Sequence, residues 1–220
     1  MTESINIVVI ISGNGSNLQS IINSIEIGQI NARISAVISN NDDAYGLIRA
    51  KNHGIESKVI DHRKFQARAE YDQTLLETVA SFQPDYIVLA GFMRILGSAI
   101  IQAYPNKILN IHPSILPSYK GLNTHQRAMD NHENEHGVSI HIVTADLDDG
   151  PILLRGRYPI EQNDTVKDLQ NKGHKLEHCM YPKLLEWLCN HDLEIEGETI
   201  MFKQQALKQP IEFDNAQLST

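Results

Sequence analysis

The sequence predicts an α/β protein with a mostly parallel, twisted sheet of about seven strands and helices on both faces. The run Ile5–Ile11 is continuous, apolar and rich in β-branched residues, which is typical of a strand buried on both faces. Strand-like and helix-like segments then alternate, a pattern that requires right-handed crossovers between parallel strands. At 220 residues, 41% of them hydrophobic and 21% charged, the chain is long enough to bury such a core.

The elements of the first half follow a regular order. The strand at Ile5–Ile11 is followed by apolar residues at helical spacing from Leu18 to Ile25, which makes this half Rossmann-like. The other elements expected here are a strand at Ile34–Ile38, a helix through Leu47 and Ala50, a strand at Ser57–Ile60, a helix over Arg68–Phe82 and a strand within "PDYIVLAG" (84–91).

The second half has a different pattern, with a long loop at 112–123. Its expected elements are a strand at Ile108–Ile111, a helix over Thr124–Asn131, strands within "GVSIHIVTA" (137–145) and "PILLRGRYPI" (151–160), a long helix over Thr165–Leu188 and a short strand around Thr199–Phe202. We therefore predict a single domain over residues 1–190, with halves at about 1–105 and 106–190, followed by a C-terminal extension at 191–220.

Charge and cysteine content argue against several classes of protein. The net charge of −8 disfavours a nucleic-acid binder, because basic side chains supply most of the affinity for phosphates. Cys179 and Cys189 form no framework for disulfides or zinc. No apolar run approaches the ~18 residues of a membrane span, and the start "MTESINIVVI" lacks the features of a signal peptide. We expect a cytoplasmic monomer or homodimer, without nucleic-acid or membrane partners.

The segment "SGNGSN" (Ser12–Asn17) follows the first strand and opens a helix. Its two glycines allow a tight turn that presents backbone N–H groups to an anion at the positive helix end, and Ser16 can cap the helix. Leu18 stands where a dinucleotide fingerprint needs a third glycine, and a Walker lysine is missing. The segment therefore favours a single phosphate over a pyrophosphate, with a plain strand–helix turn as the alternative.

The segment "GFMRIL" (Gly91–Leu96) follows the strand at 84–91 at the same edge of the sheet. It offers apolar surface with Arg94 as its lone charge. Apolar walls with few polar groups are typical of ligand clefts, so a flat aromatic ligand with a polar edge would suit it. The start of a core helix is an equally good interpretation.

Asn110 and His112 are two residues apart and so share one face of their strand. Polar groups on a buried strand end must be satisfied or useful. A lone histidine near a core is more often structural, but this pair is followed by the rigid loop Pro113–Pro117, which favours catalysis. The amide can donate a hydrogen bond to a developing oxyanion, and the imidazole can act as an acid or as an electrostatic partner.

The segment "TADLDDGP" places Asp146, Asp148 and Asp149 in a loop that returns near the strand ends. A carboxylate paired with His112 would favour the imidazolium and raise its pKa. Without such a partner, the segment would be a solvated acidic turn.

The segment "HKLEH" (His174–His178) matches a zinc signature on a helix. A third ligand and a water pocket cannot be identified, and short motifs often match by chance. We therefore predict no metal site.

Several segments together resemble a known family. In this order, "ISGNGSNLQ", "LAGFMRIL", "LNIHPSILPSYKGLNTHQRA", "EHGVSIH" and "LDDGPIL" closely resemble the phosphoribosylglycinamide formyltransferases, the folate-dependent glycinamide ribonucleotide transformylases of purine synthesis. The resemblance runs from about Ile5 to Leu188. It implies transfer of the formyl group of 10-formyltetrahydrofolate, a co-substrate, to the amine of glycinamide ribonucleotide. It implies neither a metal nor a covalent enzyme intermediate.

The resemblance also implies roles for single residues. Asn110, His112 and Asp148 match the catalytic triad, in which Asn110 and protonated His112 stabilise an oxyanion and Asp148 holds His112 charged. The remaining matches are Asn14, Gly15, Ser16 and Asn17 in the ribonucleotide-phosphate loop, Glu177 at the ribose, Arg68, Met93, Arg94, Ile95, Leu96 and Asn110 around the folate, Val143 and Asp146 within the pterin-binding loop Val143–Asp148, and Ser139 and His141 in the strand that supports the triad. Asp149 departs from the family, which commonly has glycine there.

Other functions remain open at this point. A methionyl-tRNA formyltransferase uses the same Asn, His and Asp but normally carries a further nucleic-acid-binding domain. A formyltetrahydrofolate hydrolase usually has an N-terminal regulatory domain, whereas the first strand here begins at Ile5. A non-catalytic nucleotide or folate sensor would not need the intact set of Asn110, His112 and Asp148.

Overall fold

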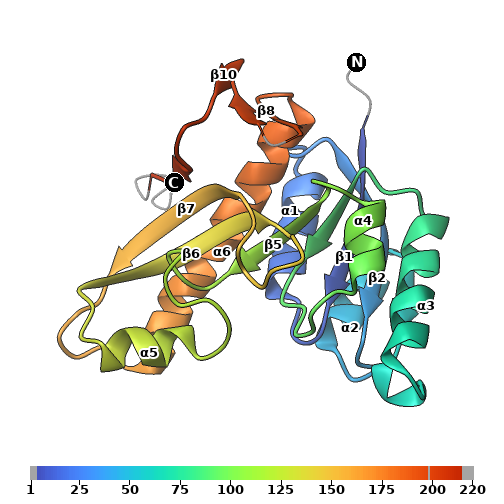
Figure 1. The fold of residues 1–220 in the computed structure, drawn as a ribbon, viewed down its shortest axis with the longest axis horizontal. Helices are drawn as coiled ribbons and strands as arrows, with labels where there is room; N and C mark the ends of the chain where they lie inside the picture. Colours follow the sequence, from blue (N-terminus) through green and yellow to red (C-terminus); the bar gives the residue numbers. More distant parts are fainter. Residues whose placement is uncertain (1–3, 198, 215–220) are drawn as a thin grey trace. The chain divides into compact units, whose positions relative to one another are not determined.

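The computed structural model describes residues 4–197 and 199–214 and confirms the predicted α/β class (Figure 1). Its central sheet has eight strands and is mostly parallel. The chain divides into two compact units, Met1–Leu109 and Asn110–Thr220. This division falls inside a strand, β5 (Ile108–His112), whose first residues belong to one unit and whose last residues belong to the other.

The first unit alternates strands and helices, as the sequence predicted. Its elements are β1 (Ile5–Ile11), α1 (Ser16–Glu26), β2 (Ala32–Ser39), α2 (Tyr45–Asn52), β3 (Ser57–Val59), a 3-10 turn at His62–Lys64, α3 (Arg68–Ser81), β4 (Tyr86–Leu89) and α4 (Ser98–Ala103). β1 pairs in parallel with both β2 and β4, and β2 pairs in parallel with β3. The strand order therefore reverses at β1, because the chain moves from β1 to β2 and β3 and then returns to β4.

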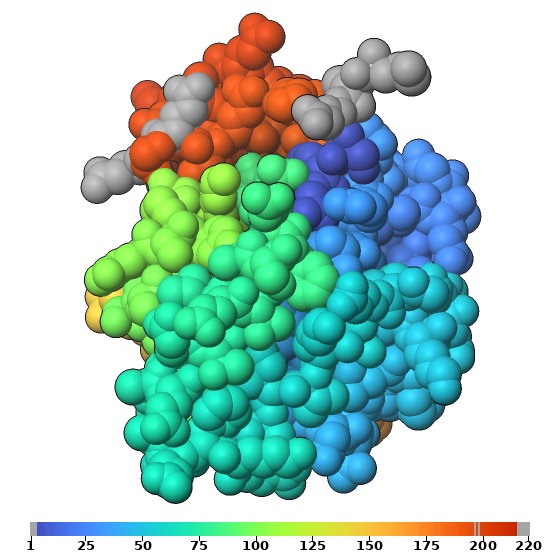
Figure 2. Space-filling model, turned by 90° about the vertical axis from the view of Figure 1, so that its right-hand side faces the viewer, coloured from blue at the N-terminus to red at the C-terminus, as the bar shows by residue number. Residues whose placement is uncertain are grey.

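The reversal at β1 sets where the helices lie and where a ligand can bind. Right-handed connections place α1 and α2 on one face of this unit's sheet and α3 on the other. Figure 2 is turned so that the face covered by α3 (teal) and α4 (green) points toward the viewer. The sheet between the two layers of helices is buried, and its residues Ile7, Val9 and Ile11 are each 0% exposed. In such sheets ligands bind beyond the carboxyl ends of the strands at the reversal, here β1 and β4.

The second unit holds the rest of β5 and a longer, partly antiparallel set of elements. These are α5 (Thr124–Asp130), β6 (Glu135–Ile142), β7 (Ile152–Pro159), α6 (Val166–Cys189), β8 (Leu193–Glu196), β9 (Thr199–Phe202), β10 (Gln205–Ala206) and β11 (Ile211–Glu212). β6 and β7 pair antiparallel, and β11 adds to β7 in parallel. Helix α6 begins with a capping box in which Thr165 and Asp168 satisfy each other's backbone N–H groups.

The central sheet has the order β11-β7-β6-β5-β4-β1-β2-β3, and β10-β9-β8 form a small separate sheet. The prediction of about seven strands missed β11, which spans only Ile211–Glu212. β11 lies in the predicted C-terminal extension. Its residue Glu212 forms an ion pair with Arg155 of β7, in which Oε1 of Glu212 lies 2.7 Å from a guanidinium nitrogen of Arg155. The predicted strand at Thr199–Phe202 is confirmed as β9. No helix among the described residues is long and apolar enough to cross a membrane.

Candidate active site

The polar residues of β5, Asn110 and His112, share their strand with buried apolar residues. Ile108 and Leu109 are 0% exposed and anchor the strand. His112 is also buried, at 6% exposed, while Asn110 is half-buried. The strand therefore presents an amide and an imidazole from one face near its carboxyl end, as their spacing predicted.

Both ring nitrogens of His112 face oxygen acceptors. Nδ1 lies 3.4 Å from Oδ2 of Asp148, and Nε2 lies 2.9 Å from the carbonyl oxygen of Tyr119. A neutral imidazole has one N–H donor, whereas an imidazolium has two. The surroundings of the ring can therefore hold an imidazolium on both sides once a proton is supplied.

The pKa of His112 reflects opposing influences. Burial lowers the pKa of His112 from its usual value, although the Tyr119 carbonyl and the charge of Asp148 both raise it. The sequence predicted that a carboxylate partner would raise this pKa, and Asp148 acts in that direction. The net pKa is nevertheless lowered, because desolvation of a ring only 6% exposed, together with nearby His141 and Arg127, outweighs Asp148 and Tyr119. Without substrates, the ring is mainly neutral at neutral pH.

Asp148 is an ionised carboxylate held from several sides. Its Oδ2 accepts the backbone N–H of Gly121 at 2.9 Å, and its Oδ1 lies 3.6 Å from Nε2 of His141. Burial alone would raise the pKa of Asp148, but the neighbouring His141, the N–H of Gly121 and the nearby His112 together outweigh it, so the pKa is lowered. Its backbone is left-handed, with φ of 49°, a conformation that persists in a non-glycine residue only where surrounding contacts hold it.

His141, predicted as a supporting residue, orients the amide of Asn110. Nδ1 of His141 lies 2.9 Å from the carbonyl oxygen of Ile142, which can only accept, so Nδ1 carries a proton. Nε2 lies 3.1 Å from Nδ2 of Asn110 and, in the neutral ring, accepts one of its N–H bonds. The second N–H of that amide is then free to donate to a ligand.

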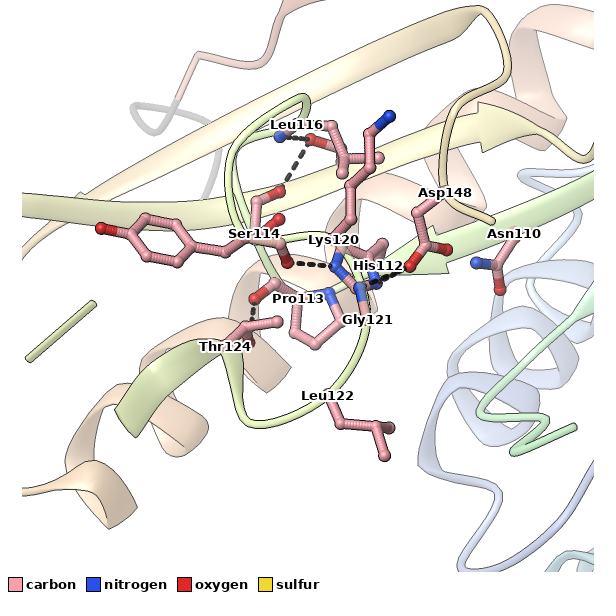
Figure 3. A network of polar contacts seen from close by, with 12 residues as sticks. Asn110, His112, Pro113, Ser114, Leu116, Lys120, Gly121, Leu122, Thr124 and Asp148 are labelled. Carbon is pink, nitrogen blue, oxygen red and sulfur yellow. Dashed lines mark hydrogen bonds and ion pairs between the residues drawn. The ribbon is translucent and has the colours of Figure 1, made fainter. Parts of the chain in front are cut away.

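The loop after β5 is held by hydrogen bonds from neighbouring elements (Figure 3). Ser139 of β6, also predicted as supporting, donates to the carbonyl oxygen of Ser114 at 2.8 Å and accepts the N–H of Leu116 at 3.0 Å. At the far end of the loop, Thr124 donates to the carbonyl oxygen of Pro113 at 2.6 Å. These bonds fix the loop so that the Tyr119 carbonyl reaches His112.

In the first unit, "SGNGSN" makes the turn between β1 and α1. Gly15 has φ of 70°, and a Cβ placed on it would lie 2.8 Å from Cα of Gly46, so the position requires glycine on both counts. The prediction that Ser16 caps α1 is wrong: the cap is Gly15 and makes no side-chain hydrogen bond. The first N–H groups of α1 are therefore left without a side-chain cap from that residue, which suits an anion.

Ser12 joins this turn to the segment after β4. Its hydroxyl donates to Oδ1 of Asn40 at 2.6 Å and accepts the backbone N–H of Met93 at 2.8 Å. The segment Gly91–Leu96 is a loop and not the start of a helix, because the next helix begins at Ser98. In this loop Met93 is 74% exposed, which leaves its side chain available to a ligand.

Two predicted folate residues lie against the same loop. Arg68, the first residue of α3, donates to the carbonyl oxygen of Ile95 at 3.0 Å. The guanidinium of Arg94 lies 5.1 Å from the centre of the Tyr71 ring. Ile95 is 56% exposed, while Leu96 is buried. Within the first unit, Arg68 and the 93–96 loop are thus brought together.

The remaining predicted residues occupy the second unit. Val143 is half-buried and Asp146 exposed in the loop that leads to Asp148, and Glu177 is buried on α6 at 6% exposed. His174 and His178, the ends of the suspected zinc motif, stack with ring centres 6.2 Å apart. No group of three or more His, Cys, Asp or Glu residues that could hold a metal occurs within residues 4–197 and 199–214.

Some residues of this arrangement were not found from the sequence. The Tyr119 carbonyl and the Gly121 N–H act through the backbone, which leaves no side-chain signal. Arg49 of α2 donates to the carbonyl oxygen and Oδ1 of Asn14 at 3.0 and 3.1 Å, and so braces the phosphate-loop candidate. Arg49 lies within the helix predicted through Leu47 and Ala50, and no sequence signal linked it to Asn14.

Comparisons with known proteins identify the family to which the chain belongs. Residues 5–185 match the formyl transferase family. The phosphoribosylglycinamide formyltransferase of Escherichia coli K12 is 42% identical over 202 residues, which cover 92% of this chain and 95% of that protein. A solved phosphoribosylglycinamide formyltransferase from Coxiella burnetii superposes with a TM-score of 0.91 at 45% identity, covering 96% of this chain and 100% of that one.

The chain has an α/β fold and belongs to the formyl transferase family, whose description matches residues 5–185. A formyltetrahydrofolate deformylase from Pseudomonas syringae also superposes, with a TM-score of 0.84 over 90% of this chain and 66% of that one, but at 22% identity. That likeness concerns the fold alone. The fold by itself therefore does not separate transfer of a formyl group from its hydrolysis.

Proposed function

We propose that this protein transfers the formyl group of 10-formyltetrahydrofolate to the amine of glycinamide ribonucleotide. The observation that carries the proposal is the placement of His112 between two oxygen acceptors, Asp148 and the Tyr119 carbonyl. An amide with a free N–H, that of Asn110, stands two residues before it on the same strand. A donor amide beside a chargeable ring suits an acyl-transfer intermediate that carries an oxyanion.

The reaction is a direct transfer. The amine nitrogen attacks the formyl carbon and forms a new C–N bond, and the formyl oxygen becomes an oxyanion in the tetrahedral intermediate. The bond from the formyl carbon to N10 of the folate then breaks. The proton that the amine loses ends on N10, which it reaches through water and the groups of the site. No oxidant, reductant or covalent enzyme intermediate is needed, and the chemistry requires no metal.

Asn110 and His112 stabilise the oxyanion in different ways. The free amide N–H of Asn110 donates to it directly. His112 acts through its charge: the approach of the oxyanion, added to Asp148 and the Tyr119 carbonyl, favours the imidazolium over the neutral ring that burial prefers. Loss of one oxyanion donor of this kind typically costs about 3–4 kcal/mol of barrier.

Each unit carries residues that are proposed to contact the substrates. In the first unit, the turn and the start of α1 at Asn14, Gly15, Ser16 and Asn17 bind the single phosphate of the ribonucleotide. Glu177 of the second unit binds its ribose. The residues proposed to contact the folate are Arg68, Met93, Arg94, Ile95 and Leu96 in the first unit and Asn110, Val143 and Asp146 in the second. The formyl donor and acceptor are both small molecules, so no nucleic-acid partner is required.

The experiment that tests this proposal is acceptor dependence. Purified protein is mixed with 10-formyltetrahydrofolate, and the folate product is followed with and without glycinamide ribonucleotide. We expect consumption only when the acceptor is present. Consumption without any acceptor would mean hydrolysis. Consumption only when methionyl-tRNA replaces glycinamide ribonucleotide would mean that the ribonucleotide is not the acceptor. Tight binding of both ligands with no turnover would identify a sensor.

A further inference from the structure

In the second unit, Lys120 and Gly121 of the loop 113–123 contact Asp149 and Asp148 of the loop 143–151. The Tyr119 carbonyl accepts from Nε2 of His112, and the Gly121 N–H donates to Oδ2 of Asp148, each at 2.9 Å. The two partners proposed to act in the transfer are therefore held by residues on either side of Lys120. Any shift of this stretch changes both bonds together.

Lys120 and its neighbour across the gap carry opposite charges. The ammonium of Lys120 forms an ion pair and hydrogen bond with Oδ1 of Asp149, the residue directly after Asp148. Figure 3 shows Lys120, Gly121 and Asp148 next to one another. The two side chains are 37% and 52% exposed, so the pair closes the outer side of the contact between the loops.

The loop that carries Asp149 is constrained on both sides of that residue. Asp148 has a left-handed backbone with φ of 49°. A Cβ on Gly150 would lie 1.9 Å from the carbonyl oxygen of Ile142, so this position is pressed against β6. Asp149 is the exposed residue between these two constraints, and its side chain is the point at which the other loop can be attached.

We propose that the ion pair between Lys120 and Asp149 is a latch that holds the loop 113–123 against the loop 143–151 and thereby positions His112 and Asp148. This inference rests on the proposed function for its catalytic readout, and it assigns a use to Asp149, which stands where glycine is common in the resembling family. Lys120 and Asp149 are positioning residues, because they act through Tyr119 and Gly121 and not on the substrates.

The size of the effect follows from the exposure of the pair. Exposed ion pairs are worth little in stability, so the latch shifts the population of the aligned loop by about 2- to 5-fold. Only the aligned loop positions His112 and Asp148 for the transfer. Loss of the latch should therefore lower kcat by this factor and leave KM for the ribonucleotide unchanged. High ionic strength screens the pair and should reduce the wild-type kcat in the same proportion.

A double-mutant cycle tests the latch. The variants are Lys120→Ala, Asp149→Ala and the double variant, with Lys120→Arg as the conservative replacement. We expect each single variant to lose about 2- to 5-fold in kcat, the double variant to lose no more than either single one, and Lys120→Arg to keep wild-type kcat. The control is Lys58→Ala, which breaks the similarly exposed pair of Lys58 with Glu56 in the first unit. Additive losses, or losses shared by Lys58→Ala, would overturn the latch.

Hydrogen exchange separates failure of the latch from failure of the proposed function. Amide exchange of the peptide that contains Gly121 should be about 2- to 5-fold faster in Lys120→Ala than in the wild type, at low salt only. This readout needs no substrate. A wild-type protein that turns over no ribonucleotide but shows the exchange difference would refute the function and keep the loop contact. Active protein with unchanged exchange and unchanged kcat in the variants would refute the latch.

Discussion

The candidate sites in the two units consist of different kinds of chemical group. In the first unit the candidate phosphate site is made of main chain: the left-handed Gly15, its close approach to Gly46 and the backbone at the start of α1. In the second unit the site is made of buried, ionisable side chains, with Asp148 and His112 set against each other and against backbone partners. A main-chain site depends on conformations that few residues tolerate, whereas a side-chain site depends on the balance between burial and charge.

Because of this difference, substitutions in the two units should have different effects. Substitution in the main-chain site should alter substrate binding through geometry. Substitution in the side-chain site should alter the chemical step, with little change to the backbone. The predictions below test that division, beginning with the largest effect.

Replacement of His112 should give the largest loss. His112→Ala removes the ring that takes up positive charge beside the oxyanion, so kcat should fall by at least about a hundredfold while KM changes little. Steady-state kinetics at saturating substrates measures this, and circular dichroism checks the fold. His53→Ala, a surface histidine paired with Glu26 in the first unit, serves as the control and should leave kcat unchanged. Wild-type activity in His112→Ala would remove the ring from the mechanism.

Loss of the charge at Asp148 should be the next largest effect. Asp148→Asn can still accept the Gly121 N–H, so the loop keeps its shape, but it no longer favours the imidazolium of His112. The pKa of His112 should fall further, and kcat should drop about ten- to a hundredfold at neutral pH. Asp130→Asn on α5 is the matched control. If Asp148→Asn changed only KM, the division between the two units would fail.

The main-chain site should respond in KM. Gly15→Ala forces a side chain into a left-handed residue and to 2.8 Å from Cα of Gly46, so the turn must move. We expect KM for the ribonucleotide to rise about tenfold, with kcat within about twofold of the wild type and a small loss of stability. Gly13→Ala, where a Cβ meets nothing within 4 Å, tests whether any added methyl disturbs the turn in the free protein. A loss of kcat in Gly15→Ala with unchanged KM would contradict the division.

The smallest effect concerns pH and is confined to the second unit. Burial lowers the pKa of His136 from its usual 6.5 to about 4, with the nearby charges of His112 and Glu133 acting in opposite directions. The unfolded chain therefore takes up a proton at a higher pH than the folded one does. The resulting stability is fully present above pH 6.5 and is lost as pH falls toward 4.

The free energy of unfolding, measured with urea at pH 7 and pH 5, should fall by roughly 1–2 kcal/mol more in the wild type than in His136→Gln. Hydrogen exchange should locate this loss in β6 and α5. An equal fall in both proteins would assign the pH dependence to other groups. A fall centred on β1 and β2 would place the sensitivity in the wrong unit.

The sequence was most informative where an element is long and strongly patterned. The strand Ile5–Ile11 was predicted with its observed bounds, because a short continuous run rich in β-branched residues is typical of a strand buried on both faces. The six-residue α4 and the two-residue β11 were missed, since a single turn or a pair of residues carries no periodic signal and depends on tertiary contacts.

The candidate site was predictable in its side chains but not in its backbone or its electrostatics. The spacing of Asn110 and His112 on a strand gave their common face directly. The Tyr119 carbonyl beside His112 and the Gly121 N–H that donates to Asp148 are main-chain groups, so no residue type marks them. The effect of a carboxylate partner on the pKa of His112 was predicted, but its net lowering was not, because burial, the larger effect, is a property of the folded protein. Ser16 was wrongly predicted as the cap, because the turn places glycine there instead.

The destination of the formyl carbon distinguishes transfer to the ribonucleotide from hydrolysis to formate. Protein in excess is mixed with 10-formyltetrahydrofolate labelled with ¹³C in the formyl group and with glycinamide ribonucleotide, and the products of one turnover are examined by mass spectrometry. We predict the label in the formylated ribonucleotide, with the same experiment on His112→Ala giving almost none. Label found in free formate, with the ribonucleotide unchanged, would contradict the account and identify a hydrolase.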